Sequence, residues 1–201
     1  MRKAINHLRK SDPVIAAIID RVGPYRIEYR EPVFETLVRS IIYQQLSGRV
    51  AKVILERLLA ACDEDPVTPE AVLRLTPRRM RLLGLSKAKT EYIRDLARRT
   101  SSGEVDFECC PSLSDEQLIE HLTRVKGVGV WTAHMFLIFA LRRPDVLPVG
   151  DLGVRTAIQR AYELPELPKP PEIIQIAEPW RPYCSVASWY LWRSLEGIAA
   201  L

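Results

Sequence analysis

The residues Leu122-Thr-Arg-Val-Lys-Gly-Val-Gly-Val-Trp-Thr-Ala133, followed by Pro148-Val-Gly-Asp151, are the most informative part of this chain. Gly127 and Gly129 flank one apolar residue between two segments with helical spacing, which predicts a tight turn. A helix that begins after such a turn directs backbone N–H groups and its positive dipole end outward, an arrangement that suits an anion. Asp151 stands where a second helix should begin. The two features together indicate a protein that holds a phosphate backbone and does chemistry with a carboxylate.

Each feature also has a simpler explanation. A Gly-x-Gly between helices is commonly a plain turn, and an Asp before a helix is commonly an N-cap that stabilises by roughly 1 kcal/mol. In this combination and order, however, the residues resemble the signature of the helix-hairpin-helix DNA glycosylases: a hairpin, a Gly/Pro-rich stretch and an aspartate. The likeness is greatest to the alkylation-repair branch typified by 3-methyladenine DNA glycosylase II, and it runs from about Pro32 to Trp192.

The composition fits a soluble globular protein. Hydrophobic residues make up 47% and charged residues 27% of 201, and the net charge of +4 permits nucleic-acid binding. The four cysteines show no Cys-x-x-Cys spacing, which argues against a zinc site or a disulfide framework. Some superfamily members carry a four-cysteine iron–sulfur loop near the C-terminus; only Cys184 lies there, so we expect no cluster. No apolar run approaches the ~20 residues that a membrane span needs. We therefore expect a cytoplasmic, nucleoid-associated protein of prokaryotic type.

Helix signals recur along the whole chain. Three cap-plus-proline pairs (Asp12-Pro13, Thr68-Pro69 and Thr76-Pro77) mark helix starts, and Ser114-Asp-Glu-Gln117 has the spacing of a capping box. Apolar periodicity or caps predict helices over 14–22, 33–42, 50–60, 86–99, 130–141, 151–162, 172–177 and 183–195, with shorter ones after Pro69 and Pro77 and one after the capping box. Because β-branched alternation is scarce, we predict an all-α fold of roughly ten helices.

The resemblance implies two helical lobes around a central DNA-binding cleft. We expect a single glycosylase unit over 1–201, with lobes of approximately 33–144, including the hairpin 122–133, and 1–32 plus 145–201.

The resemblance also implies the residues that act on the base. Asp151 would be the catalytic residue, and Trp131 and Trp192 would line the base pocket, where they would stack on a positively charged alkylated purine. Met135 and Leu152 stand where the family has pocket tyrosines. Superfamily members that also cut the backbone have a lysine at the position of Trp131; without it we expect a monofunctional hydrolase. The remaining aromatics Trp180, Trp189 and Tyr183 are expected to be packing residues.

DNA contacts are expected at three places. The hairpin residues Lys126, Gly127, Gly129 and Thr132 would bind the backbone, as would Ser86 at a helix start. Gln45 or Leu46 would be the wedge that fills the gap left by a flipped base, unless Leu46 is core and Gln45 merely solvated. The resemblance implies a monovalent cation held near Lys126 and Val128, but no other metal. The basic cluster Arg78, Arg79, Arg81, Lys87 and Lys89 is either a further phosphate contact or a solvated face.

The sequence thus predicts a monomeric, monofunctional DNA N-glycosylase without cofactor. It would excise alkylated purines such as 3-methyladenine and 7-methylguanine from damaged double-stranded DNA in base excision repair. Two alternatives remain: a glycosylase for mismatched or deaminated bases, and a catalytically silent DNA-binding protein that uses the hairpin alone.

Overall fold

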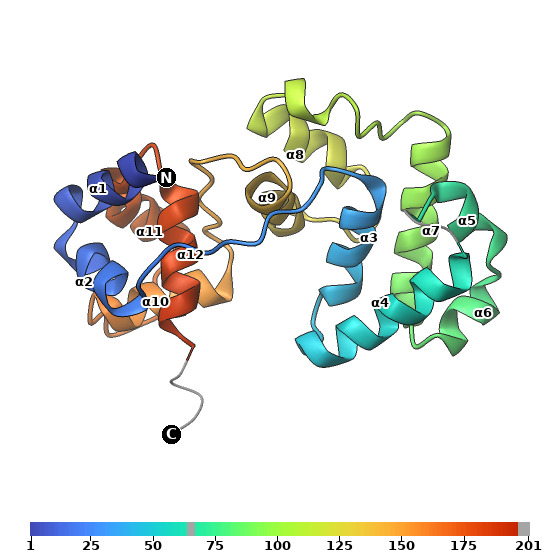
Figure 1. The fold of residues 1–201 in the computed structure, drawn as a ribbon, viewed down its shortest axis with the longest axis horizontal. Helices are drawn as coiled ribbons and strands as arrows, with labels where there is room; N and C mark the ends of the chain where they lie inside the picture. Colours follow the sequence, from blue (N-terminus) through green and yellow to red (C-terminus); the bar gives the residue numbers. More distant parts are fainter. Residues whose placement is uncertain (64–66, 197–201) are drawn as a thin grey trace. The chain divides into compact units, whose positions relative to one another are not determined.

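The computed structural model describes residues 1–63 and 67–196. Over these ranges the chain forms twelve α-helices and two short 3-10 helices, and no strand (Figure 1), which confirms the all-α prediction. The chain divides into two compact units, residues 1–29 with 142–201 (unit 1) and residues 30–141 (unit 2).

The unit boundaries lie three residues before those expected from the sequence. Residue 30 belongs to unit 2, because the Arg30 N–H donates to the Phe139 carbonyl at 2.9 Å. Residues 143 and 144 belong to unit 1, because their carbonyls accept from Ser185 in its last helix, at 2.7 Å from the hydroxyl and 3.0 Å from the N–H.

Unit 1 is built around its last helix. Figure 1 shows α12, in red, with α2 and α10 packed against it, and its core includes the fully buried side chains of Trp180 and Tyr190. The packing role predicted for Trp180 and Trp189 is confirmed, since they are 0% and 7% exposed. The α-helices of this unit are α1 (Arg2–Ser11), α2 (Pro13–Val22), α10 (Leu152–Ala161), α11 (Pro170–Ala177) and α12 (Cys184–Ser194), and its 3-10 helix is η2 (Glu178–Trp180).

A buried carboxylate ties these elements together. Asp12 caps α2, and its Oδ1 accepts from the N–H groups of Val14 and Ile15 at 2.8 and 3.2 Å. Its Oδ2 accepts from the Trp180 indole at 2.8 Å and from the Tyr162 hydroxyl. Burial raises the pKa of Tyr162 most, and the hydrogen bond to Asp12 raises it further. The hydroxyl therefore stays protonated and donates to Asp12. The helix start predicted at Asp12-Pro13 is confirmed.

Unit 2 contains the remaining helices. The long helix α7 packs against α3 and α5, and α9 packs against α3 and α8. The predicted caps are confirmed: Thr68, Thr76 and Ser86 each accept a first-turn N–H, and Ser114 and Gln117 form a capping box. The α-helices are α3 (Phe34–Tyr43), α4 (Gly48–Cys62), α5 (Pro69–Arg74), α6 (Pro77–Leu82), α7 (Lys87–Ser101), α8 (Asp115–Thr123) and α9 (Val130–Phe139), with the 3-10 helix η1 (Cys110–Ser112).

One helix, α1, was not predicted from the sequence. Only Ala4 and Leu8 of α1 are buried. The apolar residues Ala4, Ile5 and Leu8 do recur at helical spacing among charged ones, so this local pattern could have predicted the helix.

Candidate active site and nucleic-acid interface

The hairpin lies between α8 and α9 in unit 2, as the sequence predicts. Gly127 adopts φ +78°, and a Cβ placed there would lie 2.1 Å from the ring of Tyr92 on α7. Gly129 has φ −96°, and a Cβ at this position would meet nothing within 4 Å. Only Gly127 is therefore obligatory for this turn, while Gly129 keeps open space at the start of α9.

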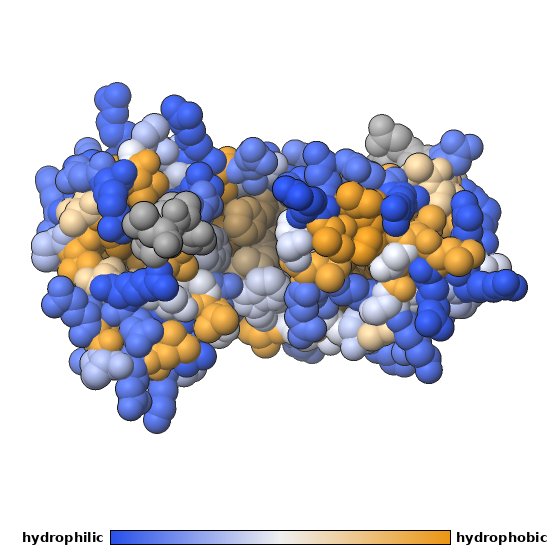
Figure 2. Space-filling model, turned by 90° about the horizontal axis from the view of Figure 1, so that it is seen from below, coloured by the Kyte–Doolittle hydropathy of each residue, from blue (hydrophilic) through white to orange (hydrophobic). Residues whose placement is uncertain are grey.

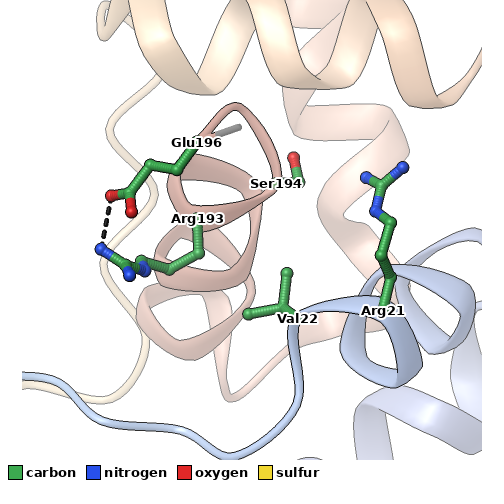
Figure 3. Close-up of a pocket in the computed structure, with 5 residues that line it drawn as sticks. All are labelled: Arg21, Val22, Arg193, Ser194 and Glu196. Carbon is green, nitrogen blue, oxygen red and sulfur yellow. Dashed lines mark hydrogen bonds and ion pairs between the residues drawn. The ribbon is translucent and has the colours of Figure 1, made fainter. Parts of the chain in front are cut away.

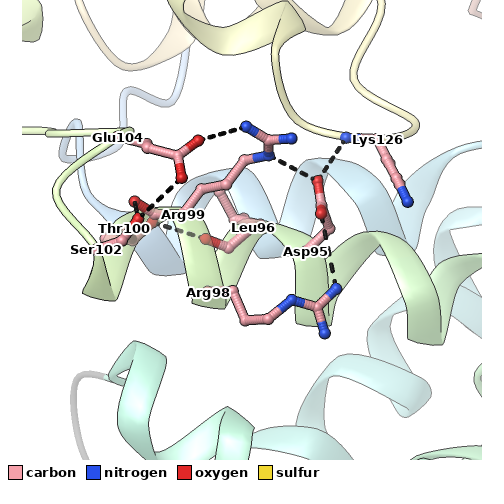
Figure 4. Close-up of polar contacts among 8 residues, drawn as sticks. All are labelled: Asp95, Leu96, Arg98, Arg99, Thr100, Ser102, Glu104 and Lys126. Carbon is pink, nitrogen blue, oxygen red and sulfur yellow. Dashed lines mark hydrogen bonds and ion pairs between the residues drawn. The ribbon is translucent and has the colours of Figure 1, made fainter.

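Asp95 on α7 fixes the hairpin loop. Its Oδ2 accepts from the backbone N–H of Lys126 and from Arg99 Nε, both at 3.0 Å (Figure 4). Burial alone would raise the pKa of the Asp95 carboxyl, but these hydrogen bonds and the Arg99 charge outweigh it and hold the pKa below its ordinary value. Because Asp95 uses the Lys126 amide, a DNA contact at Lys126 has to come from its exposed side chain.

The loop after α3 is tied to the same hairpin. The Gln44 amide donates to the Gly127 carbonyl at 2.9 Å and to the Thr132 hydroxyl at 3.2 Å. Lys89 Nζ donates to the carbonyls of Ile42 and Gln44 at 2.7 and 2.6 Å, and burial lowers the pKa of this lysine. Lys89 therefore caps the end of α3 and does not belong with the phosphate contacts that we considered for the basic cluster.

The two candidate wedge residues lie in this loop. Gln45 adopts φ +54°, and both Gln45 and Leu46 are exposed, so the alternative in which Leu46 is core is wrong. Figure 2 shows hydrophobic side chains gathered on the face of unit 2 where α4 lies. Leu46, just before this helix, and Val50 and Val53 within it are exposed. The structure leaves both Gln45 and Leu46 available as a wedge.

The predicted site residues on α9 differ in exposure. Trp131, in the first turn, is 40% exposed and so has aromatic surface available to a base, and Met135 one turn later is partly buried. Thr132 is 2% exposed. Its hydroxyl accepts from Gln44, so a contact between Thr132 and the DNA backbone, which stays a prediction, would use its backbone N–H and not the hydroxyl. This side chain connects the hairpin to the Gln44 loop instead.

Asp151, the predicted catalytic residue, lies in unit 1 at the start of α10. The turn before it is closed by a hydrogen bond from the Asp151 N–H to the Pro148 carbonyl at 2.9 Å. The side chain caps α10 and is 8% exposed. Its Oδ1 accepts from the Val154 N–H and from Trp192 Nε1 on α12, both at 2.7 Å. Two donors on one oxygen fix the direction of the carboxylate.

Two neighbours complete this arrangement. Leu152, which is 65% exposed, follows Asp151 directly. Gly153 leaves room for the tryptophan, since a Cβ there would lie 3.0 Å from Trp192 Cδ1 and 3.1 Å from Asp151 Oδ1. The contribution of Gly153 was not predicted from the sequence. The one signal at this position is a glycine in the first turn of a helix, where glycine lowers the helix propensity.

The structure brings the predicted residues together in two groups. Asp151, Leu152 and Trp192 belong to unit 1. The hairpin, the Gln44 loop and the start of α7 form the second group in unit 2, where Ser86 caps α7 by accepting from the Lys89 N–H at 3.2 Å. Gln44 and Asp95, which hold this group together, were not predicted.

A cavity of about 310 Å³ in unit 1 has no such organisation. It lies between the end of α2 and the end of α12 and is lined by Arg21, Val22, Arg193, Ser194 and Glu196 (Figure 3). Arg193 pairs with Glu196, and the Ser194 hydroxyl donates to the Leu191 carbonyl. Several of its polar groups are thus already paired within α12 and the residues just after it.

Residues 1–63 and 67–196 form neither a metal-binding cluster nor a membrane-spanning helix. Within these ranges no three His, Cys, Asp or Glu side chains gather as a metal site would require, and none of the four cysteines is in a disulfide. No helix there is long and apolar enough to cross a membrane.

Comparison with known proteins identifies the family of this chain. Residues 38–182 match the model of the HhH-GPD superfamily of base excision DNA repair proteins, and the chain belongs to this family. DNA-3-methyladenine glycosylase 1 of Schizosaccharomyces pombe is 34% identical over 200 residues, which cover 96% of this chain and 87% of that protein.

Two solved structures are similar in fold and sequence. The 3-methyladenine DNA glycosylase of S. pombe in complex with abasic DNA has a TM-score of 0.87 at 34% identity, covering 96% of this chain and 97% of the other. A DNA-3-methyladenine glycosidase from Bacillus halodurans has a TM-score of 0.84 at 33% identity, covering 98% and 91%.

Proposed function

We propose that this chain is a monofunctional DNA N-glycosylase that hydrolytically releases alkylated purines such as 3-methyladenine and 7-methylguanine during base excision repair. The observation that carries the proposal is the Asp151 carboxylate, held by Val154 and Trp192 at the start of α10. The relatives named above, which carry 3-methyladenine glycosylase names, support this substrate class.

The chemistry asked of Asp151 is electrostatic. When the bond between the base and the sugar breaks, its electron pair leaves with the purine, and positive charge develops on the sugar. A fixed carboxylate stabilises that charge more in the transition state than in the ground state, which is what lowers the barrier. Water then adds to the sugar carbon and loses a proton, leaving an abasic site.

The residue at position 131 explains why the backbone is left intact. Cleavage through a Schiff base needs an amine at the sugar carbon, and the tryptophan here supplies none. Trp131 instead offers an aromatic face, on which a positively charged purine gains cation–π attraction of roughly 1–2 kcal/mol when desolvated.

Binding of double-stranded DNA is assigned to the hairpin. The N–H groups at the start of α9 would meet a backbone phosphate, since no side chain in the described ranges caps this helix. Backbone carbonyls near Lys126 and Val128 are the hard oxygen donors that a monovalent cation takes. The carbonyl of Gly127 between them already accepts from Gln44. We place the enzyme as a monomer on chromosomal DNA in the cytoplasm of a prokaryotic cell.

Randomly methylated DNA tests the proposal directly. Incubation should release 3-methyladenine and 7-methylguanine, identified by chromatography. Asp151→Asn keeps an oxygen that accepts from Val154 and Trp192 but removes the charge. We expect its single-turnover rate to fall about a hundredfold or more, roughly 3 kcal/mol.

Asp20→Asn is the matched control, because it makes the same change at an exposed surface carboxylate of unit 1. It should retain the full rate. Base release by Asp151→Asn at the rate of the control, in a folded protein, would refute the assignment of Asp151.

A further inference from the structure

Unit 2 contains a basic cavity that joins Lys126 of the hairpin loop to Arg81 and Lys87 of the basic cluster. It measures about 360 Å³ and lies between α6, α7 and the hairpin loop. Five basic side chains line it, whereas only Glu91 among the lining residues is acidic. The five are Arg81, Lys87, Arg94, Arg98 and Lys126.

Not all of these cations are neutralised by the protein. Arg94 donates to the Leu75 carbonyl at 2.6 Å, and Arg98 lies 3.6 Å from the Asp95 carboxylate. Figure 4 shows Arg98 and Lys126 on opposite sides of Asp95, and the Lys126 side chain directed away from the carboxylate. The side chains of Arg81, Lys87 and Lys126 meet no carboxylate within the described part of the chain. The cavity thus keeps at least three unpaired positive charges around one volume.

A buried hydroxyl points to what the cavity holds. Thr90 lines the cavity and is only 3% exposed. Its side-chain oxygen has no hydrogen-bond partner among the described residues. A buried hydroxyl without a partner is destabilising, so such groups in native proteins are usually satisfied by a ligand or by water. An oxyanion surrounded by arginine and lysine is a ligand that would accept a hydrogen bond from this hydroxyl.

We propose that this cavity binds a phosphate group, and that in the working protein the phosphate belongs to the DNA backbone. The second part rests on the proposed function. Lys126 belongs both to the hairpin loop and to the cavity, so a DNA strand anchored at the hairpin reaches the cavity with a further phosphate. Arg81 and Lys87 then supply charge, and Thr90 supplies a directed hydrogen bond.

Three variants separate the contributions. Arg81→Gln removes one charge from the cavity. Arg79→Gln is the matched comparison. Arg79 belongs to the same basic cluster and the same helix, but it is exposed and does not line the cavity, so the proposal assigns it to the solvated face. Thr90→Val removes only the hydroxyl and keeps the shape of the side chain. Affinity for an undamaged duplex is measured by fluorescence anisotropy over a series of salt concentrations.

We expect Arg81→Gln to weaken duplex binding roughly threefold at low salt and to lower the slope of log K against log salt by about 1. Arg79→Gln should leave the slope unchanged. Thr90→Val should weaken binding without changing the slope, because it removes no charge. Equal slopes for Arg81→Gln and Arg79→Gln, with unchanged affinity for Thr90→Val, would show that the cavity is only a solvated charged face and would overturn the proposal.

Titration with inorganic phosphate distinguishes the source of the ligand. In wild-type protein it should shift the backbone amide signals of Lys87 and Thr90, and Thr90→Val should reduce the shift. If phosphate shifts these signals but the variants do not change the salt slope of duplex binding, the cavity binds free phosphate and not the DNA backbone, and the second part of the proposal is overturned. Base release by wild-type protein is measured in parallel. If the salt slopes are as expected but no base is released, the glycosylase assignment is refuted and the phosphate site stands. If bases are released but the salt slopes do not differ, the phosphate site is refuted and the glycosylase assignment stands.

Discussion

At the scale of single residues, Trp192 makes a contact that the sequence did not indicate. The resemblance implies a ring that stacks on the base, but the structure places its indole nitrogen 2.7 Å from Asp151 Oδ1. A hydrogen bond to a charged group stabilises by roughly 1.5–3 kcal/mol, more than a bond between neutral groups. Trp192 is therefore a positioning residue for the carboxylate, whether or not its face also meets a base.

Trp192→Phe separates these two contributions, because it keeps an aromatic face and removes the N–H donor. We expect the single-turnover rate of 7-methylguanine release to fall roughly tenfold, since one hydrogen bond to the carboxylate is lost. Affinity for undamaged duplex should not change. Rates are measured at saturating enzyme, and folding is checked by thermal denaturation.

Trp189→Phe, on the same helix, is the control for stability. Trp189 is 7% exposed and packs on Tyr25 with ring centroids 4.6 Å apart, so its replacement should lower stability and leave the rate intact. A full rate for Trp192→Phe would mean that the hydrogen bond from Trp192 is not needed to orient Asp151.

At the scale of elements, the hairpin is a loop held from three sides rather than a free turn. Tyr92 closes the space beside Gly127, Asp95 holds the Lys126 N–H, and Gln44 holds the Gly127 carbonyl. These contacts come from α7 and from the loop after α3, far away in sequence. No local pattern could have predicted them, although the turn itself could be predicted from its two glycines.

The two hairpin glycines should therefore differ in their response to the same substitution. Gly127→Ala combines a left-handed φ with a Cβ that would lie 2.1 Å from the Tyr92 ring, and we expect it to lower the free energy of unfolding by roughly 2–4 kcal/mol. Gly129→Ala, in open space with φ −96°, should cost about 1 kcal/mol or less. Urea denaturation of both variants measures the difference; equal losses would contradict this account of the turn.

Asp95 makes the stability of unit 2 depend on pH in a defined direction. A carboxyl with a lowered pKa in the folded state binds its proton more readily when unfolded, so its contribution is complete above the unfolded pKa of about 4 and is lost as pH falls through the folded value. Asp95→Asn should lower stability at pH 7 and flatten the acid limb of the stability curve. The control is Glu56→Gln, an exposed carboxylate of the same unit. An acid limb of wild-type steepness in Asp95→Asn would exclude Asp95 as its source.

At the scale of the whole molecule, features that depend on neighbouring residues could be predicted from the sequence, whereas contacts between distant segments could not. Caps such as Asp12, Ser114 and Asp151 were found because the cap and the N–H groups that it accepts lie within three residues. The burial of Thr132 and the use of Lys89 as a cap were missed, because both depend on the Gln44 loop, more than 40 residues away in sequence. The two-unit division depends on backbone bonds of the same long-range kind.

The substrate preference of the enzyme follows from the kind of catalytic group that it uses. The catalytic residue on which the proposal rests is a carboxylate that stabilises the sugar cation, so the leaving group has to depart without much further help. Alkylation at N3 or N7 gives the purine a positive charge, which weakens the bond to the sugar and also favours stacking on an exposed tryptophan. Met135 and Leu152 stand where the resembled family has pocket tyrosines. Fewer aromatic rings are therefore available to stack on a neutral base, which has no positive charge to add to its binding. We therefore expect 3-methyladenine and 7-methylguanine to be released much faster than hypoxanthine from duplexes of the same sequence. Single-turnover rates on the three substrates measure this, and hypoxanthine release at the rate of 7-methylguanine would contradict the selection by charge.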